Sequence, residues 1–183
     1  MAKMVINAKV RTVTGKTAAK NLRKEGRIPA VVYNSKGEAT MLDVDEIEFN
    51  KVWRSITKTT VITLNVDGKE CDALIKDTEY NIRTDKVLHA DFFAPDADQK
   101  VYEKMKVLIR GTAAGVLKGG FLVKHLPEIE LKATLANLPV RIEADVSKLG
   151  IGDVFTVKDL GLSSEIELIT PIDTPLANVA PAR

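Results

Sequence analysis

The sequence of 183 residues has one cysteine, two histidines and no long apolar run, and each scarcity excludes a class of protein. A single cysteine, Cys71, rules out an internal disulfide framework, and with only two histidines it cannot complete a tetrahedral zinc site. No apolar stretch approaches the roughly 20 residues that cross a bilayer, and the first residues lack the apolar core of a signal peptide. We therefore expect a cytoplasmic protein that has no contact with membranes and no metal or other cofactor.

Charge is the second informative feature, because the net charge of +2 is unevenly distributed. Residues 1–33 contain eight Lys or Arg and one acidic residue, a net charge of +7, whereas residues 34–93 carry −4 and residues 94–183 carry −1. A local excess of positive charge attracts phosphate even when the whole chain is nearly neutral. The first segment therefore points to a polyanion partner, although a basic surface that serves only solubility remains an alternative.

The first half of the chain has the pattern of a small mixed domain. β-branched and alternating runs predict strands at 4–11, 28–33, 38–45 and 87–93, with a hairpin around Asp67-Gly68. A short helix is expected at 18–25, capped by Thr17 and ended by Gly26, and a second helix at 46–56, capped by Asp45. We expect residues 1–95 to form an α+β domain resembling a β-barrel.

The pattern of apolar and polar residues changes after the Pro- and Asp-rich stretch "APDADQK" at 94–100, which we interpret as the domain boundary. Strict alternation of apolar and polar residues in "EIELKATL" and "VRIEADV" predicts strands with one wet face, and hence an antiparallel sheet. No segment beyond residue 100 has the pattern of a helix longer than about two turns. Residues 96–183 should therefore form a mostly antiparallel β domain, which makes the whole chain mainly β with short helices.

The helix at 18–25 combines an apolar face with a basic edge. Lys16, Lys20 and Arg23 fall in one narrow stripe at helical spacing, about 120° from an apolar cluster, so the helix can dock and still present cations. Arg11, at the end of the first strand, could join this edge. Phosphate binding is favoured over a solvated helix face, which stays open as the alternative.

Three further residues are candidates for binding. Tyr33 ends an apolar strand, where its hydroxyl can reach a ligand, although a tyrosine at such a boundary is more often structural. His89 and Asp91 share one face of the last strand of the first domain and can contact a base or a ribose 2′-hydroxyl. Residues two apart on a strand stand about 7 Å apart, so we do not expect a hydrogen-bonded dyad. Catalysis is disfavoured because no Ser or Cys is placed as a nucleophile.

The glycine-rich stretch "GTAAGVLKGG" at 111–120 matches neither the dinucleotide-binding fingerprint nor the phosphate-binding loop of nucleoside triphosphatases. Its glycine spacing is wrong for both, and no Lys-Ser or Lys-Thr pair follows Gly120. A connection between strands that needs positive φ angles is the better interpretation.

"KVRTVTGKTAAKNLRKEGRIPAVVYN", followed about fifty residues later by "HADFF", resembles the bacterial large-subunit ribosomal proteins that bind 5S ribosomal RNA. The chain is similar to the two-domain form, also known as the general stress protein Ctc family, over essentially its whole length. The resemblance implies an amino-terminal β-barrel that binds the minor groove of an internal loop of 5S RNA. Arg11, Lys16, Arg23, Tyr33, His89 and Asp91 match contact positions of the family, and Lys20 matches a position that is commonly basic.

Two departures bear on this comparison. Asn21 stands where some members have a second Arg, and Asn34 follows the tyrosine where Gly is frequent, so the set of RNA contacts could be smaller. For the second domain the resemblance implies contact with the ribosome surface or with neighbouring ribosomal proteins, without naming residues. The expected function is a structural, non-enzymatic ribosomal protein of the large subunit. The alternatives are a stress protein that binds polyanions loosely off the ribosome and, less favoured, an enzyme using His89 and Asp91 with the glycine-rich loop.

Overall fold

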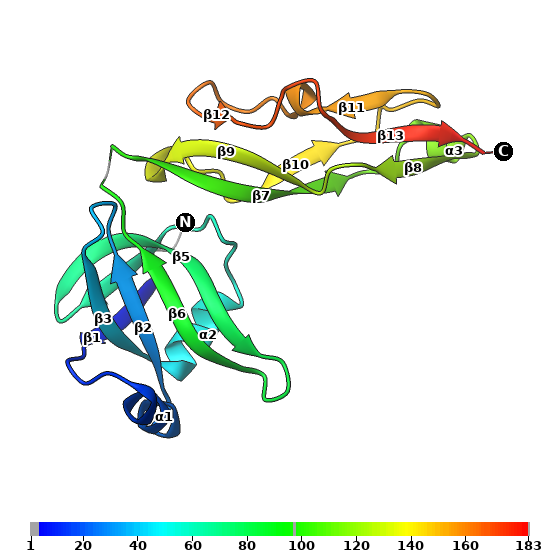
Figure 1. Cartoon of the computed structure of the whole chain (residues 1–183). Helices are drawn as coiled ribbons and strands as arrows, with labels where there is room; N and C mark the ends of the chain where they lie inside the picture. Colours follow the sequence, from blue (N-terminus) through cyan, green and yellow to red (C-terminus); the bar gives the residue numbers. More distant parts are fainter. Residues whose placement is uncertain (1–3, 97, 183) are drawn as a thin grey trace. The chain divides into compact units, whose positions relative to one another are not determined.

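The computed structural model describes residues 4–96 and 98–182. These residues form two compact units, which divide between Gln99 and Lys100. The domain-boundary segment predicted at 94–100 includes residue 97, which lies outside the described residues. Figure 1 shows that both units are built mainly from strands. The prediction of a mainly β chain with short helices and two domains is therefore confirmed.

The first unit is a closed six-stranded barrel with two short helices. Its strands follow one another around the barrel in the order β1-β3-β2-β6-β5-β4, and β4 pairs with β1 to close it. Two of the pairings, β1 with β4 and β2 with β6, are parallel. The elements are β1 (Val5–Val10), α1 (Lys16–Lys24), β2 (Arg27–Tyr33), β3 (Ala39–Asp45), α2 (Glu46–Trp53), β4 (Ile62–Val66), β5 (Lys69–Asn81) and β6 (Lys86–Phe93).

The barrel interior is filled by apolar side chains that alternate along the strands, as the period of a strand requires. Phe49 of α2 is fully buried and packs edge-on against Phe92 of β6, with ring centroids 6.1 Å apart. Asp45 caps α2 as predicted, because its carboxylate accepts hydrogen bonds from the backbone N–H groups of Ile47 and Glu48. The hairpin predicted at Asp67-Gly68 joins β4 to β5, with positive φ angles of 47° and 89° at the two residues.

The start of α1 differs from the prediction. Gly15, and not Thr17, is the residue that precedes the helix, with φ 99° and no side-chain cap. Gly26 follows the helix with φ 74°, in the left-handed conformation expected for it. α1 therefore lies between two glycines whose backbone conformations other residues rarely adopt.

The second unit contains two sheets. One is four-stranded, in the order β10-β7-β9-β12, and the other is three-stranded, in the order β11-β13-β8. The strands are β7 (Lys100–Arg110), β8 (Gly120–Lys124), β9 (Glu128–Thr134), β10 (Ile142–Asp145), β11 (Val154–Thr156), β12 (Glu167–Leu168) and β13 (Pro175–Pro181); the single-turn helix α3 covers Ala114–Leu117.

Most pairings of the second unit are antiparallel, but β10 runs parallel to β7. The expectation that "VRIEADV" pairs in an antiparallel manner is wrong, because β10 is parallel to its neighbour β7. Alternation shows that one face of a strand is exposed to solvent, but it does not give the direction of the neighbouring strand. The glycine-rich stretch makes the connection between β7 and β8, with φ angles of 81° at Gly111 and 92° at Gly119. This agrees with a stretch that needs backbone freedom.

Candidate nucleic-acid interface

Helix α1 carries three of the predicted binding residues on one flank. Lys16 and Lys20 are exposed, and Arg23 is half-buried. The Nε of Arg23 donates a hydrogen bond to the backbone carbonyl oxygen of Leu88 on β6, 3.0 Å away. This bond brings the basic flank of α1 next to the strand that carries His89 and Asp91.

Leu88 can accept this bond because β6 contains a bulge. Glu79 of β5 lies opposite His89, but the next residue, Tyr80, lies opposite Val87, so Leu88 has no partner across the ladder. The extra residue also lets Val87 and Ala90, three positions apart, both point into the core. The bulge thus frees a carbonyl for α1 and sets which face of the barrel His89 occupies.

The side chains of His89 and Asp91 meet on the outer face of β6, because the residues that follow each of them, Ala90 and Phe92, are in the core. The His89 Nδ1 lies 2.8 Å from the Asp91 Oδ1, so the two side chains come much closer than the separation of about 7 Å expected from the strand repeat. The repeat of about 7 Å separates equivalent backbone positions, whereas side chains on the same face can lean toward each other. With Nδ1 turned to the carboxylate, Nε2 is the ring atom that can face a ligand.

Two acidic residues that sequence reasoning missed stand beside this pair. In the register between β5 and β6, Asp77 lies opposite Asp91 and Glu79 opposite His89, so all four share the outer face. Carboxylates repel phosphate but accept hydrogen bonds from base amines and ribose hydroxyls. The alternation in "KDTEY" indicates that these two acidic residues share one face of a strand. It does not show that this face lies beside His89 and Asp91, which depends on the register between β5 and β6.

Tyr33 lies at the end of β2, beside Phe93 of β6. Their rings are tilted by 42°, with centroids 5.4 Å apart. Phe93 is a third residue that sequence reasoning missed. Asn34, which follows the tyrosine, is used in the turn to β3, where its side-chain oxygen accepts hydrogen bonds from the backbone N–H groups of Lys36 and Glu38.

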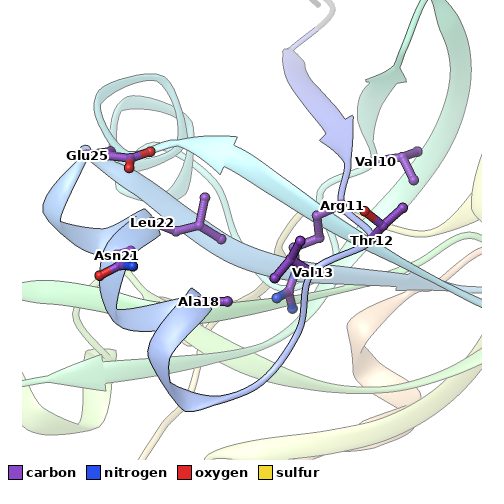
Figure 2. Close-up of a pocket in the computed structure, with 8 residues that line it drawn as sticks. All are labelled: Val10, Arg11, Thr12, Val13, Ala18, Asn21, Leu22 and Glu25. Atoms are coloured by element: carbon purple, nitrogen blue, oxygen red, sulfur yellow. The ribbon is translucent and has the colours of Figure 1, made fainter.

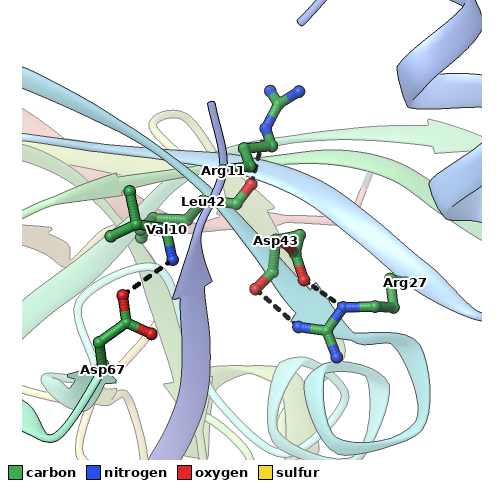
Figure 3. Close-up of polar contacts among 6 residues, drawn as sticks. All are labelled: Val10, Arg11, Arg27, Leu42, Asp43 and Asp67. Atoms are coloured by element: carbon green, nitrogen blue, oxygen red, sulfur yellow. Dashed lines mark hydrogen bonds and ion pairs between the residues drawn. The ribbon is translucent and has the colours of Figure 1, made fainter. Parts of the chain in front are cut away.

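Arg11 lies on the other side of α1 from the basic flank. Its backbone N–H and its Nε donate hydrogen bonds of 3.0 Å to the carbonyl oxygens of Met41 and Leu42 respectively, and both acceptors belong to β3. Figure 3 shows this contact with Leu42. Arg27, also drawn there, pairs with the Asp43 carboxylate and donates from Nη2 to its carbonyl oxygen, 3.1 Å away. Arg27 is thus held by β3, which leaves fewer cations of the first segment for a ligand.

The described parts of the chain lack the features of a metal site and of a membrane-spanning helix. Residues 4–96 and 98–182 contain no group of three or more His, Cys, Asp or Glu side chains that could hold a metal ion. None of the helices described is long and apolar enough to span a membrane. His89 belongs to the first unit and the glycine-rich stretch to the second.

Comparison with known proteins identifies both halves of the chain. Residues 6–92 match the ribosomal L25p family, and residues 100–183 match the C-terminal domain of ribosomal protein TL5. The large ribosomal subunit protein bL25 of Treponema denticola is 37% identical over 179 residues, covering 98% of this chain and 85% of the relative. The protein of the same name from Geobacillus thermodenitrificans is 32% identical, covering 97% of this chain and 85% of the relative.

Proposed function

Because the chain belongs to the ribosomal L25p family, we propose that it is a structural protein of the large ribosomal subunit that binds 5S ribosomal RNA through its first unit. In this role it is not an enzyme and works in the cytoplasm, on the ribosome. The proposed RNA surface consists of Arg11, Lys16, Lys20, Arg23, Tyr33, His89 and Asp91.

One observation carries this proposal: the Arg23–Leu88 hydrogen bond places a cationic helix flank beside an acidic and histidine-containing strand face. Cations alone would bind any polyanion, and carboxylates alone would repel it. Side by side, the cations suit the phosphate backbone, and the His89–Asp91 pair suits base edges and 2′-hydroxyls. This division of roles supports an RNA-specific site over loose polyanion binding.

The second unit is proposed to contact the ribosome surface or neighbouring ribosomal proteins. Three cations on the outer face of β7 are each paired with a carboxylate: Lys100 with Glu167 at 3.0 Å, Lys104 with Glu130 at 2.8 Å and Arg110 with Glu143 at 2.9 Å. Such paired cations release few counterions and contribute little to RNA affinity. A protein surface is therefore the better partner for this face.

Sedimentation of cell extract at moderate salt tests the proposal. A ribosomal protein sediments with the large subunits and is lost from them when 5S RNA is absent. A protein that stays at the top of the gradient in cells with intact subunits would instead be the off-ribosome stress protein. Titration of the purified chain with 5S RNA and with an unrelated RNA of similar length then measures specificity directly.

A further inference from the structure

A groove runs along the flank of α1 opposite the basic edge. It has a volume of about 340 Å³ and lies between α1 and the chain that follows β1. Figure 2 shows Ala18, Asn21 and Leu22 on the helix side and Arg11 and Val13 on the other. A groove of this size is at the lower end of the range for small-molecule sites, about 300–1,000 Å³. Of the proposed RNA surface, Arg11 is the residue that lines it.

The walls of the groove are apolar and accessible. Val13 is 70% exposed and Val10 47% exposed, which are high values for valines in a folded domain. Ala18 and Leu22 are only partly buried, although they face the body of the protein. Accessible apolar side chains on both sides of the groove favour a ligand with apolar faces.

Four polar side chains line the groove, those of Arg11, Thr12, Asn21 and Glu25. Arg11 lines the groove together with Val13 and Ala18 (Figure 2), and the bond from its Nε to the Leu42 carbonyl oxygen restrains its guanidinium group. The Asn21 amide can donate and accept hydrogen bonds at once, and Glu25 adds a carboxylate at the end of the helix. A carboxylate disfavours phosphate here but accepts from an amine, so the groove suits the flat, hydrogen-bonding edge of a base.

We propose that this groove binds one unstacked nucleobase of the RNA, stacked on the Arg11 guanidinium and hydrogen-bonded by Asn21. This inference rests on the proposed function, since it names what a second part of the same RNA does. Unstacked bases in RNA loops are bound in this manner, by stacking on a guanidinium plane and by polar contacts at their edges. The groove lies about 180° around the helix from the basic flank of Lys16, Lys20 and Arg23. The nucleobase and the phosphate backbone of the RNA therefore contact opposite flanks of α1.

Two substitutions test the groove in the full-length chain. Ala18→Leu fills it with a larger side chain while keeping a strong helix former, and Asn21→Ala removes the amide. Ala136→Leu and Asn137→Ala, at exposed positions of the second unit, are the matched controls. Thermal midpoints within a few degrees of the wild type show that each variant is folded.

We expect Ala18→Leu to weaken 5S RNA binding at least tenfold and Asn21→Ala about fivefold, with an unchanged dependence on salt because no phosphate contact is lost. Base-specific chemical probing with dimethyl sulfate and a carbodiimide should show at least one base that the wild type protects and Ala18→Leu leaves reactive. Unchanged affinity and protection in both folded variants would overturn the base site alone. If the wild-type chain itself failed to bind 5S RNA, the proposed function would fall, and the base site with it.

Discussion

Arg23 on α1 and Leu88 on β6 are joined by a hydrogen bond from Nε to a backbone carbonyl oxygen, 3.0 Å long, across 65 positions of the chain. The bond uses one edge of the guanidinium and leaves the two terminal nitrogens for phosphate. Arg23 therefore has two roles in the proposed site: it is a cation, and it positions α1 against the strand of His89.

The substitution Arg23→Lys separates these two roles. It keeps the positive charge but removes the planar guanidinium group that can bind the Leu88 carbonyl oxygen and phosphate at the same time. We expect 5S RNA affinity to fall about fivefold, equivalent to about 1 kcal/mol, the usual contribution of one hydrogen bond. The measurement is equilibrium binding at fixed salt. Arg141→Lys, the same change at an exposed position of the second unit, serves as the control, and wild-type affinity in Arg23→Lys would show that charge alone matters.

Asp91 offers a test of specificity. Asp91→Asn removes the charge beside His89 while keeping the shape of the side chain. We expect discrimination between 5S RNA and an unrelated RNA to fall by roughly 1–3 kcal/mol, the scale of one good base contact. Competition binding measures this ratio. If the variant bound both RNAs more tightly by the same factor, the carboxylate would be a repulsive bystander.

Local signals made much of the fold predictable. The Asp45 cap and the Asp67-Gly68 turn depend on residues within a few positions of one another, and alternation along a strand reports only which face is wet. Those features were all confirmed.

The features that sequence reasoning missed depend on contacts between distant segments. The bulge at Leu88 exists because β5 and β6 change register, and the acceptor it frees is used by a helix 65 residues away. The parallel pairing of β10 with β7 follows from the path of the chain between them. No local propensity encodes either feature, since both are settled by packing.

The division of roles between the two units gives a further prediction. Residues 1–99, expressed alone, should bind 5S RNA within a few-fold of the full chain, because the proposed contacts all lie in the first unit. Residues 100–183 should show no binding at physiological salt, because three cations of β7 are already paired. Gel-shift titration of both fragments decides this. Comparable affinity in the second fragment would contradict the assignment of 5S RNA binding to the first unit.

The second unit should lose stability in acid through its paired carboxylates. Hydrogen bonds from Lys104 and then Tyr102 lower the pKa of Glu130 below its ordinary value of 4.5, and Lys100 lowers the pKa of Glu167 in the same way. A carboxylate whose pKa is lowered in the folded state stabilises the fold above about pH 4.5. This stabilisation is lost as the pH falls through the pKa of the folded state. Thermal midpoints of the second unit between pH 7 and pH 3 should fall less steeply in Glu130→Gln than in the wild type. Identical profiles would show that these surface pairs do not contribute.

Substitution of Lys20 tests phosphate contact directly, because Lys20 is exposed on the basic flank of α1 and its side chain makes no hydrogen bond or ion pair with the described residues. Each phosphate contact contributes about 0.7–0.9 to the slope of log affinity against log salt. Lys20→Ala should therefore weaken binding to every RNA alike and flatten that slope by about one unit. With four to six contacts in the wild type, raising salt from about 50 to 200 mM should weaken binding on the order of 10²–10³-fold. A folded triple variant with Lys16, Lys20 and Arg23 changed to Ala should lose most of this dependence. If it kept both the affinity and the slope of the wild type, the basic flank would be a solvated helix face and the RNA would have to bind elsewhere.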